Sequence, residues 1–180
     1  MSDFADELAK LHSLQGADFS RQVERIAQRG EFYPLKGEEG IFVVGGEGDP
    51  DYNNLLNAAR KMVSHGYTAY ILPNPKGIRT ADLIIRKKNV YRVYDVKTIT
   101  GKSSAGNRLI ESIGQTFSVI LNIRSDYFAR VLALNVRAYF ETSPQVIEVI
   151  VLKGRKMISV KRNLAVSKQF LETFRKLYEK

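Results

Sequence analysis

Asp82, Asp95 and Lys97 are the residues of this sequence whose types and spacing are best suited to chemistry. Asp95 and Lys97 stand two positions apart in the run Tyr-Arg-Val-Tyr-Asp-Val-Lys-Thr-Ile, and Asp82 precedes them in Thr-Ala-Asp-Leu-Ile-Ile. Residues two apart on a β-strand project to the same face, so the Asp95 carboxylate and the Lys97 ammonium are expected side by side. Charges on an interior strand are costly unless they pair or meet a metal ion.

The short polar segment Lys87-Lys88-Asn89 predicts a tight turn between two strands, which can bring Asp82 beside Asp95. Two carboxylates, with a backbone carbonyl and waters, suit Mg²⁺ or Mn²⁺. Such an ion acidifies a bound water and neutralises charge on a phosphate under attack. Lys97 would then orient the water or stabilise the transition state. The alternative is a structural Asp–Lys pair with Asp82 as a turn cap, and the spacing alone leaves both interpretations open.

The elements around these residues predict an α/β fold, in which helices pack on a mixed sheet. Apolar spacing predicts helices over residues 2–14, 18–29, 51–64, 108–115, 126–141 and 164–179, and strands over residues 41–44, 67–72, 81–86, 90–99, 117–123, 146–152 and 156–161. Composition and charge both change near Asp49-Pro50. We therefore expect two parts, an acidic helical N-terminal appendage over residues 1–49 and the main domain over residues 50–180.

The charge of the chain is unevenly distributed. Its net charge is +9, but residues 1–50 carry 5 Lys/Arg against 10 Asp/Glu, whereas residues 51–180 carry 23 against 9. A basic body of this kind is expected to attract polyanions, of which nucleic acid is the commonest. A soluble basic protein without that function is the alternative on charge alone.

Composition also excludes several classes of protein. The 180 residues include no cysteine, which rules out disulfides, thiolate zinc sites and cysteine nucleophiles. No stretch approaches the roughly 18 to 20 apolar residues of a membrane span. The N-terminal segment Met-Ser-Asp-Phe-Ala-Asp-Glu-Leu-Ala-Lys is acidic and amphipathic, unlike a secretory signal. We therefore expect a soluble protein that acts in the cytoplasm.

The pattern around Asp82, Asp95 and Lys97 resembles the PD-(D/E)xK nuclease superfamily, in which an Asp-bearing strand and a short turn precede an acidic-x-Lys strand and a helix. More narrowly, residues 51–161 resemble the C-terminal tRNA-nuclease toxin domains of contact-dependent growth inhibition proteins (the CdiA type). The narrower resemblance rests on Ser-His-Gly-Tyr-Thr-Ala-Tyr-Ile-Leu-Pro after a helix, on Tyr-Asp-Val-Lys-Thr-Ile, and on a Ser-rich loop, a helix, an apolar strand and a closing hairpin that follow.

This resemblance implies a restriction-endonuclease-like core and a role for each matched residue. Asp82 and Asp95 would hold the metal, Lys97 would assist the water, and Gln115 would support the site from the following helix. Further residues are expected to contact nucleic acid, for which solvated loop or surface positions are the alternative: Arg92, Lys102, Ser103, Ser104 and Arg108. An acidic immunity protein is the partner that the resemblance implies.

The sequence departs from the family at one position. Such nucleases often carry a Glu on the first helix of the core, whereas this sequence has Asn53 near the expected place. An Asn oxygen can ligate a metal but adds no charge, and Asp51 or Glu47 would have to substitute.

Three functions follow. The first is a metal-dependent endonuclease that hydrolyses RNA, with tRNA as the preferred substrate by resemblance, as a bacterial toxin-type domain. The second is a DNA endonuclease of a phage or mobile element. The third is a non-catalytic nucleic-acid-binding domain, motivated by the missing Glu. Two basic hairpins, at residues 86–92 and 153–162, are open to both nucleic-acid contact and a purely structural interpretation.

Overall fold

The computed structural model describes residues 2–44, 51–74, 80–113 and 116–180. The chain divides into two compact units, Met1–Tyr94 and Asp95–Lys180. The predicted division at residues 49–50 lies outside the described residues and stays a prediction. No helix of the described part is long and apolar enough to cross a membrane.

The prediction of an α/β fold is confirmed. The described strands form a mixed sheet in the order β1-β2-β3-β4-β5-β6-β7-β8. Their bounds are β1 Phe32–Pro34, β2 Ile41–Val44, β3 Thr68–Ile71, β4 Leu83–Lys87, β5 Val90–Ile99, β6 Ser118–Ile123, β7 Glu148–Lys153 and β8 Lys156–Lys161. The strand β5 is shared by the two units, because it pairs antiparallel with β4 over Val90–Tyr94 and parallel with β6 over Asp95–Ile99.

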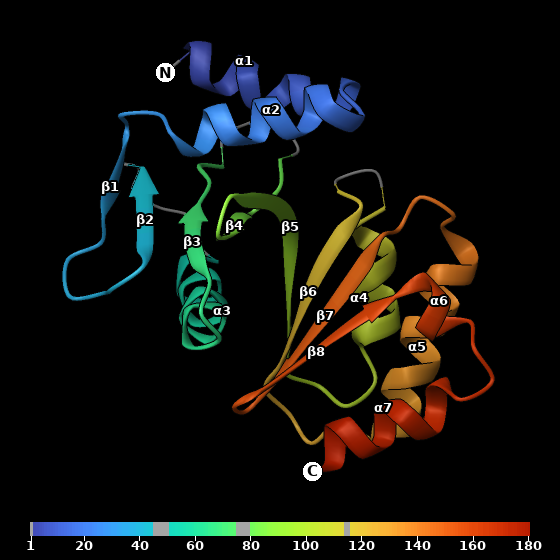
Figure 1. The fold of residues 1–180 in the computed structure, drawn as a ribbon. Helices are drawn as coiled ribbons and strands as arrows, with labels where there is room; N and C mark the ends of the chain where they lie inside the picture. Colours follow the sequence, from blue (N-terminus) through green and yellow to red (C-terminus); the bar gives the residue numbers. More distant parts are fainter. Residues whose placement is uncertain (1, 45–50, 75–79, 114–115) are drawn as a thin grey trace. The chain divides into compact units, whose positions relative to one another are not determined.

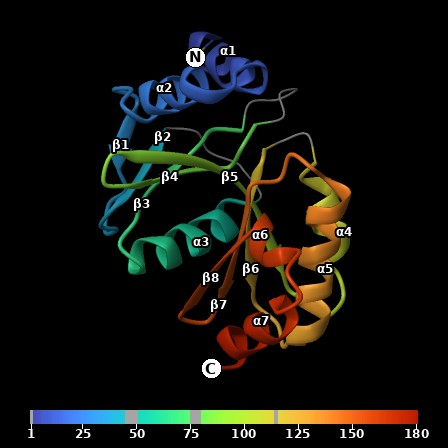
Figure 2. The same cartoon turned by 45° about the vertical axis from the view of Figure 1, so that its right-hand side comes forward.

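The first unit places three helices and a short 3-10 turn around strands β1 to β4 and the start of β5 (Figure 1). These elements are α1 Ser2–Lys10, the 3-10 turn Leu11–Ser13, α2 Gly16–Ala27 and α3 Tyr52–Ser64. The pair α1 and α2 lies side by side, as Figures 1 and 2 both show. Their apolar side chains form one core with the sheet: Leu8, Leu11, Val23, Ile26, Tyr70, Ile84 and Val93.

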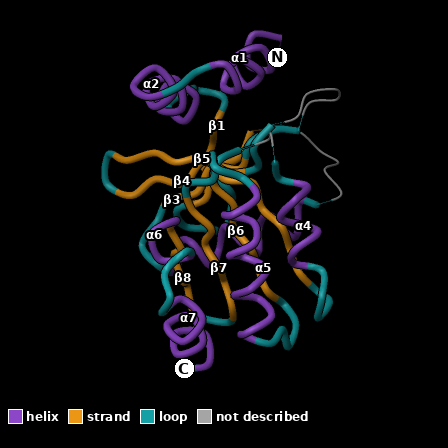
Figure 3. The backbone as a smooth tube through the Cα atoms, turned by 90° about the vertical axis from the view of Figure 1, so that its right-hand side faces the viewer, coloured by secondary structure: helices purple, strands orange, loops and turns teal. Residues whose placement is uncertain are grey.

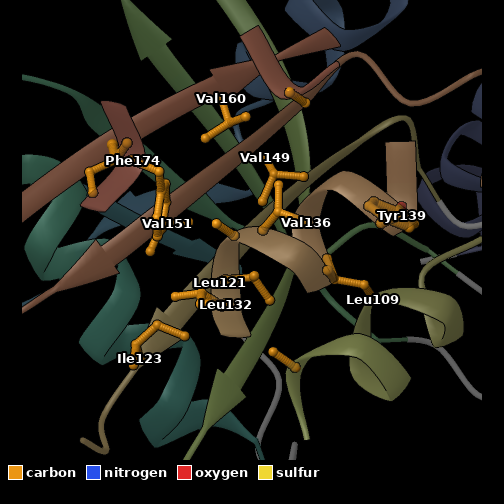
Figure 4. Close-up of a cluster of buried hydrophobic side chains, with 14 of the residues drawn as sticks. Leu109, Leu121, Ile123, Leu132, Val136, Tyr139, Val149, Val151, Val160 and Phe174 are labelled. Atoms are coloured by element: carbon orange, nitrogen blue, oxygen red, sulfur yellow. The ribbon is translucent and has the colours of Figure 1, made fainter. Parts of the chain in front are cut away.

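The second unit is built on the parallel strands β5, β6 and β7, and β8 adds an antiparallel edge. Its helices are α4 Ala105–Glu111, α5 Ala129–Thr142, α6 Arg162–Ala165 and α7 Phe170–Glu179. Parallel neighbours need crossover connections, and α4 and α5 are the helices of those crossovers. Figure 3 shows α4 and α5 beside β6 and β7. Figure 4 shows the core between them, where side chains of these helices and of α7 meet those of the strands.

The predicted C-terminal helix over residues 164–179 is wrong as a single element, because the chain breaks between α6 and α7. At the break, the Arg137 guanidinium donates to the Ala165 carbonyl at 3.0 Å and to the Ser167 carbonyl at 2.8 Å. A long-range side chain thus satisfies the carbonyls that a continuous helix would have used itself. The short strand β1 had no local signal and was not predicted.

Candidate active site

Asp95 and Lys97 lie next to each other on β5. The Lys97 Nζ is 3.3 Å from the Asp95 Oδ2, and the exposed fractions of the two side chains are 12% and 2%. Ile99, two residues further on and therefore on the same face, belongs to the core beneath the helices. The prediction that the spacing of two brings both charges to one buried face is therefore met by the geometry.

Ser112 is a second partner of Asp95, and it was not predicted from the sequence. Its hydroxyl donates a 2.6 Å hydrogen bond to the Asp95 Oδ2 from the residue that follows α4. Both groups are buried, so the bond forms away from water. A local signal existed, since Ala105, Leu109 and Ser112 follow one another at helical spacing and the first two are apolar. A hydroxyl at the end of such a buried stripe indicates a polar partner in the core.

The position of α4 is fixed at its other end by Tyr127. The Ala105 backbone N–H donates to the Tyr127 hydroxyl at 3.2 Å, and this hydroxyl donates to Asn135 Oδ1 of α5 at 2.7 Å. Gly106 allows the close approach of the two helices, because an added Cβ would lie 3.2 Å from Asn135 Nδ2. These contacts hold α4 against α5 and thereby place Ser112 at the Asp95 carboxylate.

Tyr139 of α5 adds a buried hydroxyl to this unit. Its side chain is 3% exposed, and its hydroxyl has no hydrogen-bond partner among the described residues. Burial, and secondarily the charge of Asp95, raises the pKa of Tyr139 to about 12. Tyr139 was not predicted as a site residue, because it follows Leu132 and Val136 at helical spacing and such a position is typical of a core aromatic.

Asp82 stands one residue before β4 and is half-buried. Its backbone N–H donates to the Tyr94 carbonyl at 3.0 Å, so the ladder between β4 and β5 continues through it. Tyr94 is the residue that precedes Asp95 in the chain, and it closes the first unit. The prediction that the Asp82 and Asp95 carboxylates share a metal ion stays a prediction.

The remaining predicted site residues are distributed over the loop after β5 and its surroundings. Lys102 and Ser103 are exposed, and Ser104 is the half-buried residue before α4. Arg108 pairs with Glu111 of the same helix at 3.0 Å. Arg92 is exposed on β5, and Gln115 lies outside the described residues.

The helix α3 carries no carboxylate in its first turn, where the resemblance led us to expect a Glu. Asn53 is exposed, and Asn54 donates through Nδ2 to Asp51 Oδ1 at 3.2 Å. Glu47 lies outside the described residues. In the part of the chain that the structure describes, no group of three or more His, Cys, Asp or Glu side chains could hold a metal ion.

The second unit carries most of the net positive charge of the chain. Residues 95–180 contain 15 Lys/Arg against 7 Asp/Glu, a net of +8, whereas residues 1–94 contain 13 against 12. This unit therefore combines the buried Asp95–Lys97 pair with a basic composition that suits a polyanion.

The basic hairpin of β7 and β8 has a largely structural role. Lys153 donates to the Ser125 carbonyl at 2.5 Å, and Lys156 donates to the Tyr178 carbonyl at 2.6 Å. Arg162, directly after β8, donates to the carbonyls of Phe140, Ser143 and Val146 at 2.7, 2.8 and 3.0 Å. These cations satisfy backbone carbonyls, which favours the structural interpretation of this hairpin.

One solved structure is similar to this chain. No protein-family model matches the chain, and no curated protein does. A chain of the solved structure described as the CdiA-CT/CdiI toxin and immunity complex from Burkholderia pseudomallei is 19% identical, with a TM-score of 0.48, and the match covers 68% of this chain and 99% of that chain. At this identity and TM-score the similarity supports no conclusion about activity. Membership of the PD-(D/E)xK superfamily stays a prediction.

Proposed function

We propose that this chain is a metal-dependent nuclease that hydrolyses phosphodiester bonds in RNA. The observation that carries the proposal is the Asp95–Lys97 pair, in which a 3.3 Å contact joins two charges on the helix-covered face of β5. A buried charge pair costs desolvation energy that well-packed apolar residues would not. A catalytic role on a bound polyanion would explain why a unit of net charge +8 contains such a costly pair.

The proposed donor set, two carboxylates with waters, suits Mg²⁺ or Mn²⁺. Mg²⁺ is commonly held by one or two carboxylates together with waters and substrate phosphates, so a cluster of three acidic side chains is not needed. In the proposed site Asp95 and Asp82 would supply the two carboxylates, and no described group of three acidic residues competes for the ion. When bound, such an ion supplies Lewis acidity to a phosphate oxygen and acidifies water.

Residues of this chain would orient the Asp95 carboxylate, stabilise the transition state and contact the nucleic acid. Ser112, through its 2.6 Å bond, holds the Asp95 carboxylate in one orientation. Lys97 would donate to the attacking water or to a phosphate oxygen, where its charge offsets the negative charge that develops in the transition state. Burial excludes bulk water and strengthens both interactions. Gln115 remains the proposed supporting residue of the site. The proposed nucleic-acid contacts remain Arg92, Lys102, Ser103, Ser104 and Arg108.

The narrower proposal is a toxin-type domain that cuts tRNA in the cytoplasm and is neutralised by an immunity protein. The choice of tRNA follows the sequence resemblance of residues 51–161 to the CdiA-type toxin domains. An acidic immunity protein is proposed because the second unit has a net charge of +8 and opposite charge accelerates and orients association.

The test is cleavage of total tRNA, other RNA and plasmid DNA in Mg²⁺, Mn²⁺ or EDTA. We expect metal-dependent cleavage of RNA that is lost in Asp95→Asn and in Lys97→Met. The matched control is Lys161→Gln, which removes an exposed cation from the same unit and is expected to cleave as the wild type does. Cleavage of plasmid DNA in preference to RNA would show that the substrate is DNA and not RNA.

A non-catalytic nucleic-acid-binding domain is the second candidate, and one observation favours it. The Asp95 Oδ2 is already bonded to both Lys97 and Ser112, and the side chain is 2% exposed, which is the environment of a structural pair. Salt-sensitive binding of RNA by the wild type and by Asp95→Asn, with no cleavage in any metal, would select this candidate.

A further inference from the structure

The hairpin of β4 and β5 in the first unit carries a run of positive charge that the proposed catalytic residues do not use. From Leu83 to Tyr94 the chain contains Arg86, Lys87, Lys88 and Arg92 and no acidic residue. Lys88 sits in the turn in the left-handed region, with a φ of 54°. Lys87, Lys88 and Arg92 are exposed.

Arg86, Lys87 and Lys88 are consecutive cations at the turn of this hairpin. Among the described residues, neither Arg86 nor Lys87 nor Lys88 forms an ion pair with an acidic side chain. In the other basic hairpin, by contrast, Lys153 and Lys156 use their ammonium groups to bind backbone carbonyls. The positive charge of Arg86, Lys87 and Lys88 is therefore available to an external anion.

Aromatic rings hold two of these cations in place. The Lys87 Nζ lies 4.7 Å from the centroid of the Tyr67 ring. The Arg86 guanidinium lies 6.0 and 5.9 Å from the ring centroids of Tyr70 and Tyr91, and its Nη2 donates to Thr68 Oγ1 at 3.4 Å. An aromatic ring carries no net charge, so a cation over its face leaves a net positive charge, whereas a carboxylate partner would cancel it.

We propose that the β4–β5 hairpin is a binding surface for a nucleic-acid strand, in which Lys87 and Lys88 contact phosphates and the Arg86 guanidinium, lying over Tyr70 and Tyr91, offers its plane to a base. Lysines neutralise phosphates as point charges, and bases stack on guanidinium planes and aromatic rings. The inference takes its substrate class from the proposed nuclease function and adds a surface in the first unit. An acidic protein would satisfy the charges but would make no use of the stacked guanidinium.

Binding of a fluorescent single-stranded RNA to the full chain in EDTA tests the proposal without cleavage. The hairpin variant is Lys87→Gln with Lys88→Asn, since Asn tolerates the left-handed conformation better than most residues. The matched control is Lys10→Gln with Lys36→Gln, which removes the same charge from exposed positions of the same unit. We expect the slope of log affinity against log salt to fall by about 1.4 in the hairpin variant, roughly 0.7 for each lost phosphate contact. Equal losses in the two variants would overturn the proposal.

A second variant tests the stacking. Arg86→Lys keeps the charge and removes the planar group, so we expect RNA binding to weaken at least about fivefold. Binding of inorganic polyphosphate, which has no bases, should stay unchanged in the same variant. An equal loss for both probes would refute base stacking, and poly-glutamate binding as tight as RNA binding would identify an acidic protein as the partner instead.

The binding and cleavage experiments can refute the hairpin surface and the nuclease function separately. Hairpin-dependent RNA binding in a chain that never cleaves RNA would support the surface and refute the nuclease. Cleavage that depends on Asp95, together with RNA binding that the hairpin variant leaves unchanged, would support the nuclease and refute the surface.

Discussion

Ser112 donates a 2.6 Å hydrogen bond to the Asp95 Oδ2, the same oxygen that lies 3.3 Å from the Lys97 Nζ. One carboxylate oxygen thus receives a neutral donor from the end of α4 and a cation from its own strand. Hydrogen bonds to a buried charge are stronger than those between neutral groups. Ser112 therefore couples the position of α4 to the orientation of the proposed catalytic carboxylate.

Replacing Ser112 with Ala should lower the free energy of unfolding by about 1–3 kcal/mol, because a buried carboxylate loses a donor. Urea unfolding of the two proteins measures the difference. Ser103→Ala is the control, since Ser103 is exposed in the loop before α4 and should leave stability within about 0.5 kcal/mol of the wild type. Equal stability of Ser112→Ala and the wild type would show that the bond is not maintained in solution.

Replacing Lys97 with Met should destabilise the protein by about 3 kcal/mol, because it leaves the Asp95 carboxylate buried without its cation. The double variant Asp95→Asn with Lys97→Met removes both charges and should recover most of the loss. Thermal unfolding of the wild type, both single variants and the double variant measures the coupling between the two side chains. Additive losses across this cycle would contradict a stabilising interaction between them.

Local pattern was sufficient to predict most of the elements and the Asp95–Lys97 pair. The strand Val90–Ile99 was predicted with the bounds that the structure has, since its alternating apolar residues and the turn before it are local signals. The spacing of two between Asp95 and Lys97 fixes their common face whatever the rest of the fold does.

The contacts that pattern did not predict are long-range. Ser112 meets Asp95 across 17 positions of sequence, and Arg137 reaches Ser167 across 30 to end the predicted C-terminal helix. Neither residue differs by type from an ordinary surface Ser or Arg. Only the packing of α4 and α5 on the sheet brings them to their partners. Local pattern can indicate that Ser112 is buried, but it does not identify Asp95 as the partner.

Replacing Arg162 with Gln should lower the free energy of unfolding by about 2–3 kcal/mol. The guanidinium donates to the carbonyls of Phe140, Ser143 and Val146 at the end of α5, and carbonyls that lose a charged donor in a partly buried site are costly to leave unpaired. Arg155→Gln is the matched control, because Arg155 is exposed in the turn of the same hairpin. Chemical unfolding distinguishes the two, and similar stabilities would refute the structural role of Arg162.

Tyr139 and Tyr178 offer a matched test of hydrogen bonding at neutral pH. Both are buried, but Tyr178 donates to the Tyr127 carbonyl at 2.8 Å, whereas the Tyr139 hydroxyl has no partner among the described residues. Tyr178→Phe should therefore cost about 1 kcal/mol, and Tyr139→Phe should be neutral or slightly stabilising, because it removes a buried polar atom that makes no bond. Urea unfolding at pH 7 compares them, and an equal loss in Tyr139→Phe would indicate a partner for its hydroxyl.

The same two hydroxyls should make the protein sensitive to alkali. Burial raises the pKa of both Tyr139 and Tyr178 to about 12, from an ordinary value of 10.0 that the unfolded chain regains. Between these values the folded chain keeps protons that the unfolded chain has released. Stability should therefore be unaffected by these groups below about pH 10 and should fall as the pH rises toward 12.

Unfolding measured from pH 9 upward, with tyrosinate absorbance followed in parallel, tests this dependence. Tyr139→Phe should make the fall in stability less steep above about pH 10, because one of the two groups that hold a proton in the folded state is removed. Tyr33→Phe is the control, since the Tyr33 side chain is 50% exposed and should not alter the slope. A slope that Tyr139→Phe leaves unchanged would mean that this hydroxyl ionises in the folded protein as readily as in the unfolded chain, and that the surroundings of Asp95 are more hydrated than the packing of α5 implies.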